Sequence, residues 1–303
     1  MKHLKRFKEN KTLTLMVLPG ALWYILFAYL PMFGLIIAFK NYRFADGILG
    51  SAFVGLDNFE FLFRTKDAFV ITRNTILYNV AFIFLNMFFS IVMAIIFDAM
   101  GKNKLLKFNQ TVVLTPYFLS WIVVTYFVYA ILSPDKGIAN KIITFLGGKA
   151  VNWYSEPKFW PFILIFCDIW KRAGYNSIIY YSTIRGFSTE YYEAARIDGA
   201  TWFQQVRYIT LPLLSSIVVL MSMINLGHIM FSDFGLFFLV PKNSGMLYSA
   251  TSTIDTYVYN GMRNLTNMGA TSAVSLYQSF IGFVLVLTVN WIVRRKSPEN
   301  ALF

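Results

Sequence analysis

The sequence predicts an all-α integral membrane protein with six transmembrane helices. Of its 303 residues, 57% are hydrophobic and only 14% are charged. Soluble domains carry about 25% charged residues, so this composition excludes a soluble domain, and its hydrophobicity excludes intrinsic disorder. Six segments provide the roughly 20 apolar residues that cross a hydrocarbon core. One cysteine, Cys167, excludes a disulfide framework or a cysteine-based metal cluster.

The six predicted spans have different characters. The first contains Pro19 and Pro31; it is too long for the apolar region of a signal peptide and lacks a small-x-small cleavage site, so we expect it to be retained. The fourth span is the most polar. In chain order the spans run from about Thr14 to Phe39, Thr75 to Phe97, Gln110 to Leu132, Phe159 to Tyr181, Pro212 to Phe231 and Ala273 to Val293.

The distribution of Lys and Arg predicts the orientation. The two termini and the connections 98–107 and 182–210 share one side and carry 14 basic residues, against 11 spread over the longer loops of the other side. Basic residues in short loops are retained in the cytoplasm, so residues 1–13 and 294–303 are predicted cytoplasmic tails and residues 14–293 the membrane domain. The net charge of +12 therefore reflects topology, and no basic stripe indicates nucleic-acid binding.

The loops of the other side suit an extracytoplasmic position. Residues 40–73 and 133–158 are rich in Gly, Asn, Asp and aromatic residues. Their aromatic residues near span ends are typical of an interfacial belt: Trp153, Tyr154 and Trp160. The excursion 233–271 is long and polar, and its segment Ile254–Tyr259 is a predicted short surface helix.

The connection 188–212, between the fourth and fifth spans, is predicted to form two helices. The Ser-Thr pair at 188–189 caps the first helix, and Gly199 ends it. Thr201, with Gln204 three residues later, forms a capping box that opens the second helix. Such a helix–turn–helix lies across the cytoplasmic mouth of the bundle.

Docking of a partner protein on this connection is favoured over contact with lipid. Ala194 and Ala195 offer a smooth surface on which another protein can approach closely. A helix lying on lipid carries Lys and Arg on its polar face. Here acidic residues outnumber basic ones: Glu190, Glu193 and Asp198 against Arg196 and Arg207.

The stretch Glu193-Ala-Ala-x-x-Asp-Gly-Ala200, followed by Leu211-Pro212, resembles the EAA loop of permease subunits of binding-protein-dependent ABC importers. The resemblance covers the whole chain and implies a type I importer permease (MetI-like) fold with a cytoplasmic coupling helix. Four stretches resemble the branch that imports complex oligosaccharides and polysaccharide fragments: Asp233-Phe-Gly-Leu-Phe, Asn243-Ser-Gly, Ile254-Asp-Thr-Tyr-Val-Tyr259 and the tail Ser297-Pro-Glu-Asn-Ala-Leu-Phe303.

The resemblance implies a subunit that forms half of a translocation pathway in a bacterial cell membrane. Its expected partners are a second homologous permease, with a heterodimer favoured over a homodimer, two ATPase subunits and an extracytoplasmic sugar-binding protein. Glu193 is the natural partner of an ATPase arginine. The residues expected to couple to the ATPase are Glu193, Ala194, Ala195, Asp198, Gly199, Leu211 and Pro212.

The sequence independently places energy conversion on another chain. It contains no Gly-x-x-x-x-Gly-Lys-[Ser/Thr] loop, the motif whose backbone amides cradle nucleotide phosphates. ATP and Mg²⁺ are therefore expected on the partner ATPase. We expect no catalytic residue, metal site or cofactor on this chain.

Polar side chains within spans are costly and usually face the bundle interior or a water-filled cavity. The candidates for a substrate pathway are Asn86, Asp168, Lys171, Asn176, Asn225, Tyr277 and Gln278, with Asn79 and Arg172 as further polar residues of the same spans. The spacing of Asp168, Lys171 and Arg172 fits either a pathway or a self-paired cluster that fixes packing. For His228 and Asn290 an interhelical hydrogen bond is favoured. Trp121, Tyr126 and Tyr129 are candidates for stacking on sugar rings.

Other functions remain open at this stage. The same type of permease can serve peptides or other small solutes. An ion-coupled secondary transporter would show inverted repeats or paired broken helices, and a membrane enzyme would need a catalytic companion for His228. The charge of the sugar is also open, because uncharged polar spans suit a neutral sugar whereas Lys171 and Arg172 suit a uronate.

Overall fold

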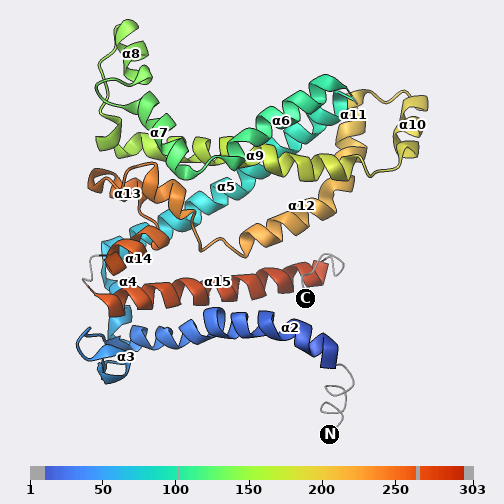
Figure 1. The fold of residues 1–303 in the computed structure, drawn as a ribbon. Coiled ribbons are helices and arrows are strands. Elements are labelled where there is room, and N and C mark those ends of the chain that lie inside the picture. Colours follow the sequence, from blue (N-terminus) through green and yellow to red (C-terminus); the bar gives the residue numbers. More distant parts are fainter. Residues whose placement is uncertain (1–10, 102, 264–266, 297–303) are drawn as a thin grey trace. The chain divides into compact units, whose positions relative to one another are not determined.

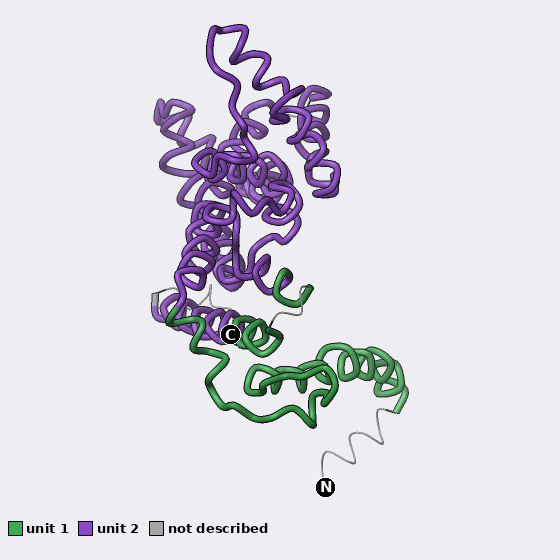
Figure 2. The backbone as a smooth tube through the Cα atoms, turned by 90° about the vertical axis from the view of Figure 1, so that its left-hand side faces the viewer, with its two compact units in different colours: residues 1–64, 260–276 green, residues 65–259, 277–303 purple. Residues whose placement is uncertain are grey.

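A computed structural model describes residues 11–101, 103–263 and 267–296 of the chain (Figure 1). These residues are mostly helical and include one short antiparallel ribbon, so the predicted all-α class is confirmed. The chain divides into two compact units, residues 1–64 with 260–276 and residues 65–259 with 277–303 (Figure 2). Most of the predicted cytoplasmic tails and the Ser297–Phe303 stretch lie outside the described residues.

The first unit begins with one continuous helical stretch. Its segments are α2 (Lys11–Tyr24), a π-helical turn η1 (Ile25–Tyr29) and a 3-10 segment η2 (Leu30–Phe39), which together match the predicted first span. Almost all side chains of this stretch are exposed, as they would be in a helix surrounded by lipid.

Residues 40–64 of the first unit form a series of short elements. Asn58 fixes the chain after η2, because its Nδ2 donates to the carbonyls of Ala38 and Lys40, both at 2.9 Å. The elements are β1 (Lys40–Asn41), α3 (Gly47–Gly50), β2 (Ala52–Phe53), η3 (Asp57–Phe59) and α4 (Glu60–Arg64); β1 pairs with β2.

The second unit is built around two long helices, α5 (Lys66–Ala99) and α9 (Trp160–Ile184), which pack against each other (Figure 1). Thr65 caps α5, since its hydroxyl accepts from the Ala68 N–H at 3.2 Å. The buried core joins these helices to the 236–247 segment and consists of Tyr78, Phe82, Trp160, Leu164, Cys167, Leu236, Phe237, Val240 and Leu247. Cys167 is therefore a small core residue.

The remaining helices follow in chain order, and α14 and α15 each belong partly to the first unit. They are α6 (Lys104–Phe118), α7 (Trp121–Leu132), α8 (Ile138–Phe145), η4 (Trp153–Ser155), η5 (Pro157–Phe159), α10 (Thr189–Ile197), α11 (Trp202–Gln205), η6 (Val206–Thr210), α12 (Leu211–Leu226), η7 (Gly235–Leu239), η8 (Gly245–Leu247), α13 (Tyr248–Thr251), α14 (Ile254–Arg263) and α15 (Met268–Lys296). The predicted surface helix at 254–259 is part of α14. The predicted fifth span ends earlier, at Leu226, where residues 227–230 turn.

Among the described residues, four helices are long and apolar enough to cross a membrane: Lys11–Phe39, Lys66–Ala99, Trp202–Leu226 and Met268–Arg295. The bent pair α6 and α7 counts as a fifth span if taken together. Helix α9 has the length of a span, but Asp168, Lys171 and Arg172 lie in its middle and make it more polar. The total of six spans stays a prediction.

The predicted third span, Gln110–Leu132, is not one straight helix. It starts at Lys104 and bends by 98° between α6 and α7. Pro116 lacks an N–H for the last turn of α6, and Ser120 starts a new helix because its hydroxyl accepts from the Val123 N–H at 3.4 Å. A proline in the last turn and a capping serine therefore break the span.

Lys171 of α9 donates to the carbonyl groups at this break, of which that of Pro116 also accepts from the Leu119 N–H at 3.2 Å. Its Nζ donates to the carbonyls of Pro116 (3.3 Å), Tyr117 (2.9 Å) and Leu119. A cation at a helix C-terminus also interacts favourably with the helix dipole. Lys171 is only 9% exposed. Its hydrogen bonds to these carbonyls hold the end of α6 against α9.

We expect Lys171→Met to destabilise the chain by roughly 1.5–3 kcal/mol, the usual contribution of hydrogen bonds to a charged group. Thermal unfolding of the purified protein in detergent, followed by tryptophan fluorescence, measures the change. Lys158→Met is the matched control, because the Lys158 side chain is 68% exposed and pairs only at the surface. Equal melting temperatures for the two variants would contradict the role of Lys171 at the bend.

Candidate coupling surface and transport pocket

Helix α10 has the two ends that the sequence predicts. At its start the Ser188 hydroxyl accepts from the Glu190 N–H at 3.3 Å. At its end Gly199 has a φ of +76°. The Ala200 N–H then reaches the Ala195 carbonyl at 2.8 Å, which closes a Schellman motif. A residue with a side chain rarely adopts this φ, so the turn after α10 depends on glycine.

The second helix of the connection continues directly into a predicted span. Thr201 and Gln204 form both halves of the capping box, and α11, the π-helical turn η6 and α12 follow without interruption from Trp202 to Leu226. Two hydrogen bonds tie the connection to this helix. Tyr192 Oη lies 3.0 Å from Thr210 Oγ1, and Gln205 Nε2 donates to the Ala200 carbonyl at 3.0 Å.

Most residues expected to couple to an ATPase lie on an open surface. Glu193, Ala194, Asp198, Gly199, Leu211 and Pro212 are exposed, and Ala195 is half-buried. Large apolar side chains beside them are also exposed: Tyr191, Ile197, Trp202 and Phe203. Ile197, with 87% of its surface accessible, has no packing role within the described structure. The surface has the small and apolar residues that a protein interface uses.

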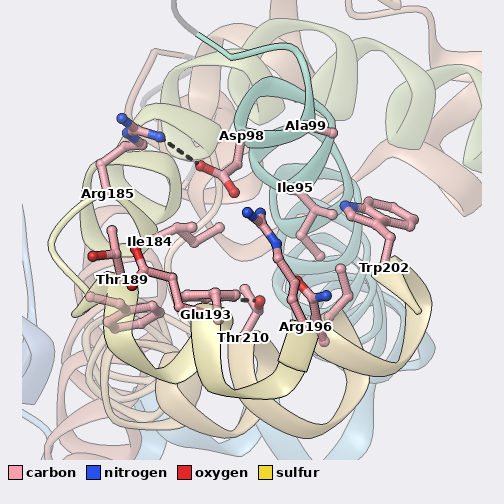
Figure 3. Close-up of a pocket in the computed structure, with 14 residues that line it drawn as sticks. Ile95, Asp98, Ala99, Ile184, Arg185, Thr189, Glu193, Arg196, Trp202 and Thr210 are labelled. Carbon is pink, nitrogen blue, oxygen red and sulfur yellow. Dashed lines mark hydrogen bonds and ion pairs between the residues drawn. The ribbon is translucent and has the colours of Figure 1, made fainter. Parts of the chain in front are cut away.

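A pocket of about 380 Å³ lies behind α10, between the ends of α5 and α9 and helix α11. Figure 3 shows the Arg196 side chain extending from α10 into this pocket, towards Asp98. Asp98 itself pairs with Arg185 at 3.3 Å, which links α5 to the end of α9. The pocket separates the exposed face of α10 from the helix bundle.

A second pocket, of about 490 Å³, lies between α5, α6, α9 and α12, and we name it the transport pocket. Four of the predicted pathway residues line it: Asn86, Asp168, Asn176 and Asn225. Asn79, Arg172 and His228 line it as well. Polar residues from three predicted spans, far apart in the sequence, therefore meet at one cavity.

A charged cluster forms one wall of this pocket. Asp168 is 2% exposed, and both its oxygens are paired, Oδ1 with Arg172 Nε at 2.9 Å and Oδ2 with Asn86 Nδ2 at 2.7 Å. Arg172 Nη2 also donates to Asp233 Oδ2 at 2.5 Å. One guanidinium thus joins a carboxylate of its own helix to one on the segment after α12.

Asp233 was not among the predicted pathway residues, although two signals point to it. An arginine in a span requires counter-charges, and Asp233 precedes a helical turn. Its Oδ1 accepts from the Gly235 and Leu236 N–H groups at 3.0 and 3.3 Å, as a capping residue does.

The other predicted pathway residues lie elsewhere. Lys171 holds the end of α6, as described above. Gln278 is buried, and its Nε2 donates to the Met230 carbonyl at 2.7 Å and to Asp255 Oδ1 at 3.1 Å. Tyr277 is half-buried and does not line the transport pocket. These three positions do not line the transport pocket, and a role for them in the pathway stays a prediction.

The structure differs from one expectation about a neighbouring residue. His228 Nδ1 lies 3.1 Å from the Ile224 carbonyl, within its own turn, and not against another helix. Trp121, Tyr126 and Tyr129 do not line the pocket, and their stacking on sugar rings stays a prediction. Its aromatic wall is instead the pair Tyr117 and Tyr175, whose rings stack at 4.1 Å between centroids and 8° between planes. Among the described residues, no group of three His, Cys, Asp or Glu is placed to hold a metal ion.

A protein family and several known proteins match this chain over nearly its whole length. The family described as "Binding-protein-dependent transport system inner membrane component" matches residues 12–298. The "Polygalacturonan/rhamnogalacturonan transport system permease protein YteP" of Bacillus subtilis is 31% identical over 96% of this chain and 90% of its own length. "Protein LplB" of the same organism is 30% identical over 97% of this chain and 92% of its own length.

Solved structures show the same likeness. A chain of a bacterial ABC transporter involved in the import of the acidic polysaccharide alginate superposes with a TM-score of 0.89 at 28% identity, covering 98% of this chain and 100% of the other. A chain of the bacterial alginate ABC transporter in complex with alginate pentasaccharide-bound periplasmic protein gives a TM-score of 0.86 at 29% identity, covering 97% of each chain.

The charged cluster predicts that two substitutions destabilise the chain to different extents. Arg172→Gln leaves the buried Asp168 without its ion-pair partner, and because the Arg172 side chain is itself 42% exposed we expect a loss of about 1–3 kcal/mol. The double variant Asp168→Asn/Arg172→Gln removes the stranded charge, so we expect it to recover most of this loss. Thermal unfolding in detergent compares the two variants. If the single and the double variant melted at the same temperature, the pairing would not stabilise α9.

Proposed function

The chain belongs to the family of binding-protein-dependent transport system inner membrane components, and from this membership we propose that it is the permease half of an ATP-driven ABC importer for a complex oligosaccharide or polysaccharide fragment. The observation that carries the proposal is the family match over residues 12–298, which includes the whole connection 188–212. Within that match, α10 presents small residues on an open surface, as a docking helix requires.

The substrate class is inferred from two features. The relative YteP and the two solved structures name polysaccharides, namely polygalacturonan, rhamnogalacturonan and alginate. Relatives of lower identity name trehalose/maltose and sn-glycerol-3-phosphate. The transport pocket, at about 490 Å³, falls in the range of small-ligand sites. Its amide, imidazole and phenol groups suit hydroxyl-rich molecules. A permease of the same type for peptides or other small solutes is the second candidate.

We infer that helix α10 docks in a groove of a separate ATPase subunit. Glu193 is exposed and has no ion-pair partner among the described residues, so it is free to meet a cation of that subunit. Tyr192 and Gln205 tie α10 to the continuous helix from Trp202 to Leu226. A displacement of α10 by the ATPase is thereby passed to the helix that lines the transport pocket.

The complete importer requires further chains. A second, homologous permease supplies the other half of the pathway, two ATPase subunits bind ATP and Mg²⁺, and an extracytoplasmic binding protein delivers the sugar. We place the chain in a bacterial cell membrane with both termini in the cytoplasm, an orientation supported by the Lys and Arg count.

Ala194→Trp should separate the chain from its ATPase. A bulky ring on the exposed face of α10 prevents close approach, so we expect co-purification of the ATPase from native membranes and sugar uptake both to fall below one tenth, since about 1.4 kcal/mol of lost contact is tenfold in affinity. Quantitative mass spectrometry of the tagged, detergent-extracted complex measures the first quantity.

Ala194→Ser, which keeps a small side chain at the same position, is the matched control and should retain the ATPase. If Ala194→Trp retained it as well, the docking assignment would be wrong. If the tagged chain came alone and transported in liposomes without ATP, the importer itself would be contradicted in favour of a secondary transporter.

Gly199 provides an independent test of the connection. Gly199→Pro forces φ to about −65°, which is incompatible with the observed +76°, so uptake should be lost while the protein still inserts. Gly199→Asn should keep substantial uptake, because asparagine tolerates the left-handed conformation. Uptake in whole cells, normalised to the amount of protein in the membrane, measures both. Normal uptake by the proline variant would show that the turn is not needed for coupling.

A further inference from the structure

Helix α8 exposes its apolar side chains and buries a polar one. Ile138, Ile142 and Phe145, three and four residues apart, share one face of the helix, and each is more than half exposed. Phe145 is 89% exposed, and Leu146, which follows it, is 76% exposed. Asn140, on the opposite face, is buried. A surface helix in water has the reverse arrangement, so α8 is suited to apolar surroundings.

Hydrogen bonds of Asn140 join α8 to the start of α9. Its Nδ2 donates to the carbonyls of Pro134 and Val151, both at 2.9 Å. Its Oδ1 accepts from the Val151 N–H and from Trp153 Nε1, both at 3.0 Å. The Trp153 carbonyl in turn accepts from Nε1 of Trp160, the first residue of α9, at 2.7 Å. A displacement of α8 is therefore passed to α9.

The charges around α8 favour lipid over protein as its apolar surroundings. Residues 136–150 contain three lysines, at positions 136, 141 and 149, and no acidic residue. All three lysines are exposed. A helix that lies in a membrane interface carries Lys and Arg on its polar side and large apolar side chains on the other. Helix α10, in contrast, carries more acidic than basic residues.

The position of α8 agrees with a place at the membrane surface. Figure 1 shows α8 next to α7, at the end of the second unit where α9 begins, with its axis across the direction of α9. Since α9 is the predicted fourth span, a helix across it lies along the membrane surface. An anchor there stabilises α9 in the membrane, because the charged residues in the middle of α9 are costly in lipid. Trp160, which the sequence predicts in an interfacial belt, is buried in the core instead.

We propose that α8 is an interfacial anchor of α9. Its apolar face lies in lipid at the membrane surface where α9 begins, which is the extracytoplasmic surface in the proposed orientation. Its lysines lie at the level of the lipid phosphates, to which their ammonium groups donate hydrogen bonds. The hydrogen bonds of Asn140 and Trp153 then fix the depth of α9. The anchor serves any cargo, so this inference goes beyond the proposed function.

Spin labels measure the depth of α8 in a bilayer. Cys167 is the one cysteine of the chain and is buried, so Cys167→Ala gives a background for single labels. The full chain, with partner subunits free of cysteine, is placed in nanodiscs of phosphatidylcholine and phosphatidylglycerol without binding protein. Labels at Ile142→Cys and Phe145→Cys should collide more with oxygen, which dissolves in lipid, than with a water-soluble nickel chelate, at a depth of about 5–10 Å. Thr144→Cys, an exposed position on the polar side of the same helix, is the matched control and should collide more with the chelate.

Three results for the label at position 145 would overturn the anchor. The first is open access to the nickel chelate, which means that the apolar face lies in water. The second is access to neither reagent in the complex, with access restored in the isolated chain, which means that the partner permease covers α8. The third is protection from the chelate only after the binding protein is added, which means that the binding protein docks there.

A second measurement tests whether α8 sets the depth of α9. Phe162, in the first turn of α9, is exposed and carries the label as Phe162→Cys. Phe145→Asp adds a charge to the apolar face of α8 and should move this label towards the water by about 3 Å, half a helical turn. Thr144→Asp, the matched control, adds the same charge to the polar side and should leave the label at its depth. An equal depth of the label with and without Phe145→Asp overturns the anchoring role.

Discussion

The packing of the second unit depends on three charged side chains in the middle of α9, each of which requires a partner. Asp168, Lys171 and Arg172 lie in the middle of a helix of span length, where an unpaired charge is expensive. Each finds its partner on a different element, so the helix is tied to three neighbours. Lys171 holds the bent end of α6, Asp168 holds Asn86 of α5, and Arg172 holds Asp233 after α12. This pairing forms one wall of the transport pocket, and Lys171 satisfies carbonyl groups at the bend that Pro116 and Ser120 produce.

Helix geometry explains why Lys171 and Arg172 contact different elements. Successive residues of an α-helix are rotated by about 100°, so Lys171 and Arg172 point to different neighbours although they are adjacent in sequence. Asp168 and Arg172, four residues apart, share a face and line the pocket together. Asp168 and Arg172 therefore line the cavity, whereas Lys171 packs against the end of α6.

Structural features that depend on residues close together in the sequence could be predicted. Features that depend on contacts between distant residues could not. The cap at Ser188, the turn at Gly199 and the capping box at Thr201 each depend on residues a few positions apart, and all three occur in the structure. The bend before Ser120 is different, because hydropathy runs through it unbroken. The carbonyl groups at the bend are bound by Lys171, some 50 residues away in the sequence, and Arg172 pairs with the distant Asp233. Both contacts depend on tertiary packing.

Some residues that line the transport pocket also stabilise the fold, whereas Asn225 does not. Arg172 and Asn86 pair with the buried Asp168 and also line the cavity, so a change at either alters the packing of the second unit. Asn225 lines the cavity but bonds only to its own helix, so the fold does not depend on it. It also lies on α12, the helix that continues from the connection at 188–212. A substitution at Asn225 therefore changes the lining of the cavity while the ion cluster and this connection stay intact.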